Sequence, residues 1–326
     1  MLKTILRPEL FHGIRRKPPF FEGWYYKVVS RDEAHRFAFI PGIYLHEKQD
    51  ECHAFVQVLD GTSGRTHFHR YPVGAFEAKA PVFELKVGES VFARDRVSLT
   101  LDGHGQRIRG SLTFRGVTPW PVTLRSPGIM GWYAWVPFME CYHGVLSLDH
   151  EIHGSLQVDG VEVDFSGGRG YIEKDWGQSF PSAHIWMQSN HFGIEHTSLT
   201  ASIAIIPWVR SSFRGFIIGF FFNGHLYRFA TYTGATVRSL RVDDSSVDWV
   251  IADRTHELTI HAVRSGGGLL HAPTTTEMSQ RLHESLTGLI DLELRERGGR
   301  TLFSGSGRNA GLEIGGNVES LLACSG

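Results

Sequence analysis

Cysteine is scarce in this sequence. The 326 residues include only three, Cys52, Cys141 and Cys324, and no two of them form a CxxC pair. An odd and scattered set argues against the disulfide framework of small secreted proteins and favours a reducing compartment. We therefore predict a cytoplasmic protein.

Long apolar runs are lacking as well. The longest covers residues 216–222 and is too short to cross a bilayer. The first residues lack a sustained apolar stretch, which predicts that there is no signal peptide. We expect a soluble protein, and such a protein can still touch a membrane surface transiently to collect a lipid.

Neither sign of charge is in excess. The chain has 33 basic and 34 acidic residues, and its formal net charge is −1. Without a basic stripe, nucleic acid is not expected as the main partner. No GxGxxG run stands between a strand and a helix, and no GxSxG elbow is present. We predict no cofactor.

Histidine, by contrast, is abundant, with 18 residues. His67 and His69 would share one face of a strand and could supply two metal ligands. No third ligand follows at a recognisable spacing, so no metal site is predicted.

Helical patterns are nearly absent, and the best candidate, residues 277–286, has a weak period. Alternation of apolar and polar residues is the main pattern, as in residues 83–87, 199–205 and 258–262. Tight-turn signals separate such runs, and Asp159-Gly160 is the most convincing hairpin. The sequence predicts an all-β, antiparallel fold with little helix.

The length of the chain favours two domains. The glycine-rich stretch at residues 166–170 is the best candidate for a flexible boundary. We predict an N-terminal domain at residues 1–168 and a C-terminal domain at residues 169–326.

Two aromatic segments carry acidic residues. In the segment YIEKDWG (171–177), a strand would place Tyr171, Glu173 and Asp175 on one face. In FFEGWYYK (20–27), Glu22 and Trp24 would share a face with Tyr26 by the same rule. Burying carboxylates among aromatic rings costs free energy, which favours a functional role.

These segments resemble the tocopherol cyclase family. The resemblance also rests on Phe180-Pro181, on WMQ (186–188) and on GLEIGG (311–316), and it runs over most of the chain. More distantly, the chain is similar to carotenoid 1,2-hydratases. The resemblance implies two lipocalin-like (calycin) antiparallel β-barrels packed side by side. Plant-type members have Asn at the position of Asp175, and their aromatic-rich tail is missing after Gly316.

The resemblance also implies chemistry on an isoprenoid double bond, which needs a buried, neutral acid. Glu173 is the expected general acid, with Asp175 and Tyr171 as its catalytic neighbours. Asp175 either donates a proton itself or holds the proton of Glu173 in place. The alternative is a structural ion pair of Glu173 with Lys174 or an Arg.

Aromatic rings and polar groups would line the substrate site, because aromatic faces stabilise a carbocation. The expected substrate-binding residues are Glu22, Trp24, Tyr25, Trp176, Trp186, Gln188 and His150. Three of them have a structural alternative: Trp24 as a core plug, Gln188 in a hydrogen-bond network and His150 as a structural histidine. Residues 140–143 are a further candidate for the pocket wall.

The sequence therefore predicts a cyclase-like enzyme that protonates a prenylated quinol or another isoprenoid. Capture of the cation by a phenol oxygen would make it a cyclase, and capture by water would make it a hydratase. The residues do not separate these two outcomes. The alternatives from other classes are a non-catalytic carrier for a hydrophobic quinone, lipid or pigment, and a structural or interaction role.

Overall fold

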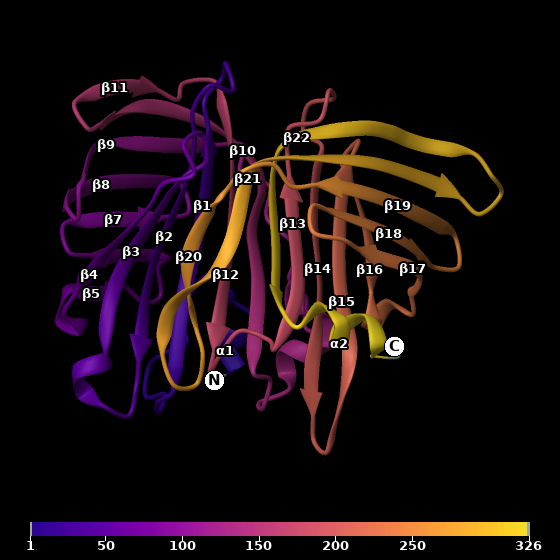
Figure 1. Cartoon of the computed structure of the whole chain (residues 1–326), viewed down its shortest axis with the longest axis horizontal. Helices are drawn as coiled ribbons and strands as arrows, with labels where there is room; N and C mark the ends of the chain where they lie inside the picture. Colours follow the sequence, from indigo (N-terminus) through magenta and orange to yellow (C-terminus); the bar gives the residue numbers. More distant parts are fainter. Residues whose placement is uncertain (1, 325–326) are drawn as a thin grey trace. The chain divides into compact units, whose positions relative to one another are not determined.

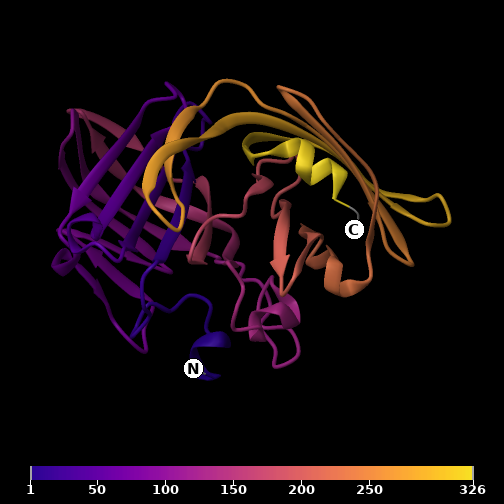
Figure 2. The same ribbon diagram turned by 60° about the horizontal axis from the view of Figure 1, so that its bottom comes forward.

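The computed structural model describes residues 2–324, and within them the chain divides into two compact units. Unit 1 comprises the chain up to Phe180 together with Leu269–Arg281. Unit 2 comprises Pro181–Gly268 and the chain from Leu282 onward. Strands predominate in both units and form strongly curved sheets (Figures 1 and 2).

The sheet of unit 1 is antiparallel, in the order β4-β3-β2-β1-β12-β10-β9-β8-β7-β6-β5, with β11 paired to β10. Its strands are β1 (Phe20–Val29), β2 (Arg36–Leu45), β3 (His53–Asp60), β4 (Thr66–Tyr71), β5 (Phe76–Ala78), β6 (Glu84–Val87), β7 (Ser90–Ala93), β8 (Arg96–Gly103), β9 (Gln106–Arg115), β10 (Cys141–Val158), β11 (Val161–Asp164) and β12 (Gly168–Gly177). The segment that carries Glu173 is thus a central strand.

The second sheet has the order β16-β15-β14-β13-β22-β21-β19-β18-β17, with β20 paired to β21. Its strands are β13 (Ala183–Ser189), β14 (Ser198–Trp208), β15 (Ser211–Phe222), β16 (His225–Ala230), β17 (Thr236–Val242), β18 (Ser246–Ala252), β19 (His256–Val263), β20 (Gly268–Pro273), β21 (Met278–Glu296) and β22 (Thr301–Gly316).

Helical segments within residues 2–324 are short. They are α1 (Leu2–Ile5), α2 (Val318–Ala323) and the 3-10 turns η1 (Gln49–Glu51), η2 (Val73–Ala75), η3 (Gly131–Trp135) and η4 (Thr231–Thr233). None of these described helices is long and apolar enough to cross a membrane. The all-β, antiparallel prediction is confirmed, whereas closure of the sheets into barrels stays a prediction.

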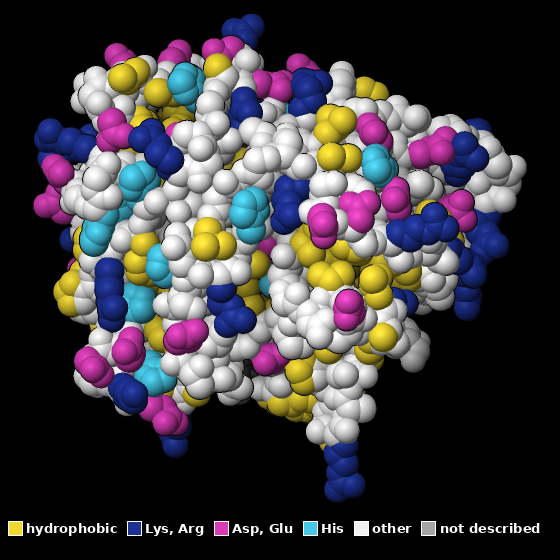
Figure 3. Space-filling model, viewed as in Figure 1, with side chains coloured by type: hydrophobic (Ala, Val, Ile, Leu, Met, Phe, Trp, Pro, Cys, Tyr) yellow, Lys and Arg dark blue, Asp and Glu magenta, His cyan; other side chains and the backbone are white. Residues whose placement is uncertain are grey.

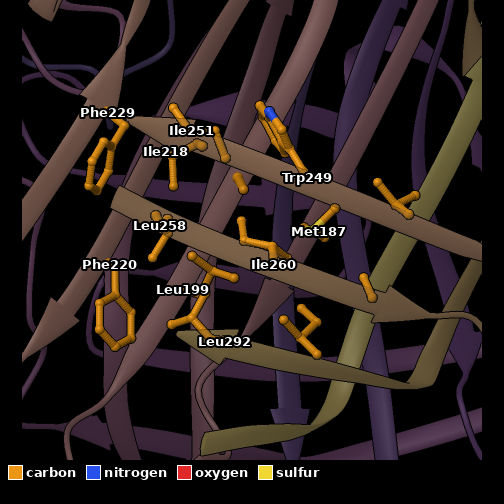
Figure 4. Packing of buried hydrophobic residues seen from close by; sticks show 14 of the residues in the cluster. Met187, Leu199, Ile218, Phe220, Phe229, Trp249, Ile251, Leu258, Ile260 and Leu292 are labelled. Atoms are coloured by element: carbon orange, nitrogen blue, oxygen red, sulfur yellow. The ribbon is translucent and has the colours of Figure 1, made fainter. Parts of the chain in front are cut away.

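Each unit has a core formed by one face of its sheet. In unit 1, Trp24, Tyr26 and Val28 alternate along β1 and enter a cluster that also includes Ile172 of β12. In unit 2, Met187 of β13 and Trp249 of β18 belong to a second cluster (Figure 4). Because successive side chains point to opposite faces of a strand, one face of each of these strands contributes to a core, and a functional site has to be sought on the other.

Two segments of the chain differ from what their sequence suggests. The boundary expected after residue 168 falls at the beginning of β12, which pairs with β1 and β10 of unit 1. The glycines there serve close approach, because a Cβ on Gly170 would lie 2.2 Å from Nε2 of His150. The best helical candidate, residues 277–286, had only a weak period, and from Met278 onward it belongs to β21, which pairs with β22.

Acidic and basic side chains are interspersed on the face of the molecule seen in Figure 3. That face agrees with the nearly balanced composition and shows no broad patch of one sign.

Candidate functional site

The outer face of β12, opposite the core of unit 1, brings Tyr171, Glu173 and Asp175 together. Tyr25 of β1 lies directly opposite Glu173, and His143 of β10 lies opposite Asp175. Directly opposed residues in antiparallel strands share a face, so all five side chains belong to one surface. The predicted strand and the shared face of its two acids are confirmed.

Two hydrogen bonds and one ion-pair contact join four of these side chains into a row. The Tyr171 hydroxyl donates to Oε2 of Glu173 at 2.5 Å. His143 contacts Oδ1 of Asp175 through Nδ1 at 2.8 Å, and its Nε2 lies 3.5 Å from Oε2 of Glu173. With a proton on Nδ1, the imidazole donates to Asp175 and turns its other nitrogen toward Glu173.

Exposure changes steadily along this row. The side chain of Asp175 is 28% exposed, that of His143 is 12% and that of Glu173 is 6%. Tyr171, at the far end, is fully buried. The row therefore links a buried carboxyl group to solvent through one imidazole. Sequence reasoning offered residues 140–143 only as a pocket wall, because no local pattern shows that His143 lies opposite Asp175, 32 residues later in the chain.

The inner face of β12 carries a separate buried cluster. The ammonium group of Lys174 lies 2.5 Å from Oε1 of Glu22 and donates to the Pro8 carbonyl at 2.9 Å. It also lies 2.9 Å from Nδ1 of His12, whose backbone N–H donates to both oxygens of Glu22. Lys174 is thus paired with Glu22 and not with Glu173, contrary to one structural alternative for Glu173.

The charges of this cluster follow from its burial. Burial lowers the pKa of Lys174 to about 8, although Glu22 acts in the opposite direction. Burial works to raise the pKa of Glu22, but the Lys174 charge and the His12 contacts outweigh it, so this pKa is lowered. Burial and then Lys174 lower the pKa of His12. At neutral pH the cluster holds an ion pair beside a neutral imidazole.

Two predicted substrate-binding tryptophans belong to this inner face. Trp24 and Trp176 flank Lys174, with ring centroids 4.5 and 4.7 Å from its Nζ. Trp24 also packs in the core of unit 1, as the structural alternative for it expected. Trp176 stacks on His12 and lines a pocket of about 340 Å³ in unit 1. Glu22, Trp24 and Trp176 therefore lie on the opposite face of the sheet from Glu173.

His150 also lies across the sheet from the acid row. The His150 ring packs against Phe114 and against Gly170. Gly170 and Tyr171 are neighbours in β12, so they face opposite sides of the sheet. Nδ1 of the His150 ring contacts the Ser147 hydroxyl at 2.9 Å, and burial lowers the pKa of His150 to about 3. The structural alternative for His150 fits this placement, and the structure does not bring it to Glu173.

Trp186 and Gln188 lie on β13 of unit 2. Ile185 and Met187 of that strand enter the core of unit 2, so Trp186 and Gln188 occupy its other face. His184 shares this face and contacts Glu313 of β22. The role of these residues in binding a substrate stays a prediction.

Comparison with known proteins gives the family. Residues 94–316, more than half of the chain, match the model of the family described as "Tocopherol cyclase-like". This chain belongs to the tocopherol cyclase-like family. It is similar to a protein of Oryza sativa subsp. japonica named "Probable tocopherol cyclase, chloroplastic" and to the "Tocopherol cyclase, chloroplastic" of Zea mays.

Both plant proteins are 26% identical over 233 residues, which make up 65% of this chain and 47% of each relative. The chain thus spans about half the length of these curated relatives. Among solved structures, CghA with Sch210972 matches with a TM-score of 0.60 at 11% identity and covers 92% of this chain and 89% of CghA. That likeness shows the fold.

Proposed function

We propose that this chain is a cofactor-independent enzyme that protonates the double bond of an isoprenoid, with Glu173 as the general acid. One observation carries the proposal: a buried carboxyl group belongs to a row of polar side chains that begins at the partly exposed Asp175. Proton donation to an alkene needs a shielded acid, and repeated turnover needs a route by which that acid regains its proton.

This row is the route by which Glu173 regains its proton. Asp175 holds the His143 ring by accepting from Nδ1, and Nε2 exchanges a proton with Glu173. The Tyr171 hydroxyl, 2.5 Å from Oε2, fixes the carboxyl group and stabilises its anion after the proton has left. The adjacent Tyr25 ring offers an electron-rich face to the carbocation.

The proposed cycle is balanced in protons. Glu173 adds one proton to an alkene carbon, and the more substituted carbon becomes the cation. A phenol oxygen of the same molecule, or a water molecule, attacks the cation and loses one proton, which returns to the row. Ring closure is then an isomerisation, and capture by water is a hydration. A prenylated quinol supplies both the double bond and the phenol.

The test is turnover of a prenylated quinol in D₂O, followed by mass spectrometry. We expect one deuterium on carbon, with either an otherwise unchanged mass for ring closure or the added mass of one water. Glu173→Gln should abolish product and retain fold and ligand binding. The matched control is Glu151→Gln, because Glu151 also faces a histidine, His153 at 3.3 Å, on the exposed part of β10.

A carrier would give a different result. It would hold unaltered, unlabelled ligand in stoichiometric amount, and Glu173→Gln would not change that amount. Retained turnover in Glu173→Gln would remove Glu173 from the acid role.

A further inference from the structure

The outer face of β12 also assembles a set of metal ligands. His143, Glu173 and Asp175 each offer one ligand atom, and these atoms lie within 4.8 Å of one another. An imidazole nitrogen and two carboxylate oxygens are donors that zinc accepts in proteins. Sequence reasoning placed the two acids together but could not add His143, because His143 lies in a different strand.

The pairing of the strands holds these ligands in place. His143 and Asp175 are directly opposite each other on β10 and β12, and Glu173 follows on the same face of β12. Side chains at such positions are neighbours without any rearrangement of a loop. All three residues therefore come from the regular part of one sheet.

The spacing of two of the ligand atoms suits a single small ion, while Asp175 contacts the other ring nitrogen of His143, Nδ1, at 2.8 Å. Zinc bonds to nitrogen and oxygen are about 2.0–2.2 Å long, so the ligand atoms around one tetrahedral ion are about 3.4 Å apart. The contact between Nε2 of His143 and Oε2 of Glu173 is already 3.5 Å. The carboxylate of Asp175, the most exposed of the three, needs to turn toward the same ring nitrogen, which a partly exposed side chain can do.

An outer layer and an approach from solvent complete the geometry. The Tyr171 hydroxyl donates to Glu173 and fixes the carboxylate, as outer-shell partners of metal ligands commonly do. Asp175, at the exposed end of the row, gives an ion access from solvent. Three protein ligands leave a coordination position for water.

We propose that His143, Glu173 and Asp175 bind a zinc ion, and that this ion inhibits the enzyme by occupying the place of the acid proton. The inhibitory role rests on the proposed function, since it assumes that Glu173 must be protonated to act. The binding of the ion does not depend on that assumption.

The experiment measures binding first and activity second. Purified full-length protein is treated with a chelator, dialysed, and titrated with Co²⁺, whose visible absorption reports coordination by the protein, and then with Zn²⁺ in competition. We expect one equivalent to bind. His143→Gln and Asp175→Asn should each weaken binding at least about tenfold, and Tyr171→Phe should weaken it by about 10–100-fold through the outer layer.

His261→Gln is the matched control. His261 contacts Oδ1 of Asp248 through Nδ1 at 2.7 Å, nearly the distance of the His143–Asp175 contact, but no third ligand joins that pair in the described residues. This variant should bind one equivalent as the wild type does. Circular dichroism of each variant checks that it is folded.

The outcomes separate the two proposals. Wild-type protein that binds no ion, or binds it equally well in all three site variants, overturns the zinc site and leaves the acid mechanism intact. Chelated protein that is active and loses activity as one equivalent binds supports both. Chelated protein that is inactive until zinc is restored overturns the metal-free acid mechanism, and with it the inhibitory role.

Discussion

Replacing Lys174 with methionine would test the buried cluster on the inner face of β12. The substitution removes a cation that lies 2.5 Å from Glu22, in a place where neither side chain is exposed. Methionine nearly conserves the volume, so the loss of charge and not a cavity determines the result. Glu22 would keep its two contacts with the backbone N–H of His12.

The size of the effect follows from the missing partner. Breaking a buried ion pair by removing one member costs about 3–5 kcal/mol, because the remaining charge is left without compensation. We expect Lys174→Met to lower the free energy of unfolding of unit 1 by this amount. The double variant Glu22→Gln/Lys174→Met should recover part of the loss, with a coupling energy of about 2 kcal/mol.

Hydrogen exchange followed by mass spectrometry is the appropriate assay, since a chain of two units need not unfold in one transition. In Lys174→Met, peptides from residues 7–13 and from β1 should exchange faster, while β18 of unit 2 keeps its protection. Glu151→Gln serves as a surface control for the procedure. If the free energy of exchange in β1 stays within about 1 kcal/mol of the wild-type value, the ion pair does not contribute the predicted 3–5 kcal/mol.

The other predictions concern single sites. His143→Gln should lower kcat and change KM little, because the imidazole returns a proton to Glu173 and does not bind the substrate. An unchanged kcat, measured under substrate saturation, would contradict this proton transfer. Burial lowers the pKa of His150 from an ordinary 6.5 to about 3, so between these pH values the unfolded chain binds more protons than the folded chain, and stability is lost as the pH falls below 6.5. His150→Gln should remove about 1.4 kcal/mol per pH unit from the pH dependence of the free energy of unfolding, measured by denaturation across that range. Equal slopes in the variant and the wild type would argue against the burial effect. Gly170→Ala should destabilise unit 1 by about 1–3 kcal/mol, because the new methyl group meets the His150 ring at 2.2 Å, and thermal unfolding checks this. Trp249→Ala should cost unit 2 about 3–5 kcal/mol and leave hydrogen exchange in β12 unchanged.

Local periodicity was enough to predict much of this molecule. Alternation along residues 171–175 and 20–27 correctly placed Glu173 with Asp175, and Glu22 with Trp24. The same rule could not say which of the two faces of β12 each set occupies relative to the other. That information lies in the register of β1 against β12, where Trp24 is opposite Lys174 and Tyr25 is opposite Glu173.

Long-range pairing explains the remaining differences. His143 joins the acids only because β10 pairs with β12, and Lys174 finds its partners in residues 8–12, far away in the chain. His150 was expected at the site, but the register of β10 against β12 places it opposite Gly170 on the core face, where the missing side chain leaves room for its ring. Contacts of this kind leave no periodic trace in the sequence.

The return of residues 269–281 to unit 1 constrains how the protein can be divided. Gln57 of β3 exchanges two hydrogen bonds with the backbone of His271, at 2.6 and 3.0 Å, and the His271 ring stacks on Phe68. A fragment that stops at Phe180 would lose the two hydrogen bonds and the ring stacking. A fragment that begins at Pro181 would contain residues 269–281 without their partners in unit 1. Neither fragment is therefore a self-contained folding unit. A gene fusion that ends at residue 180 would have to supply this stretch from outside.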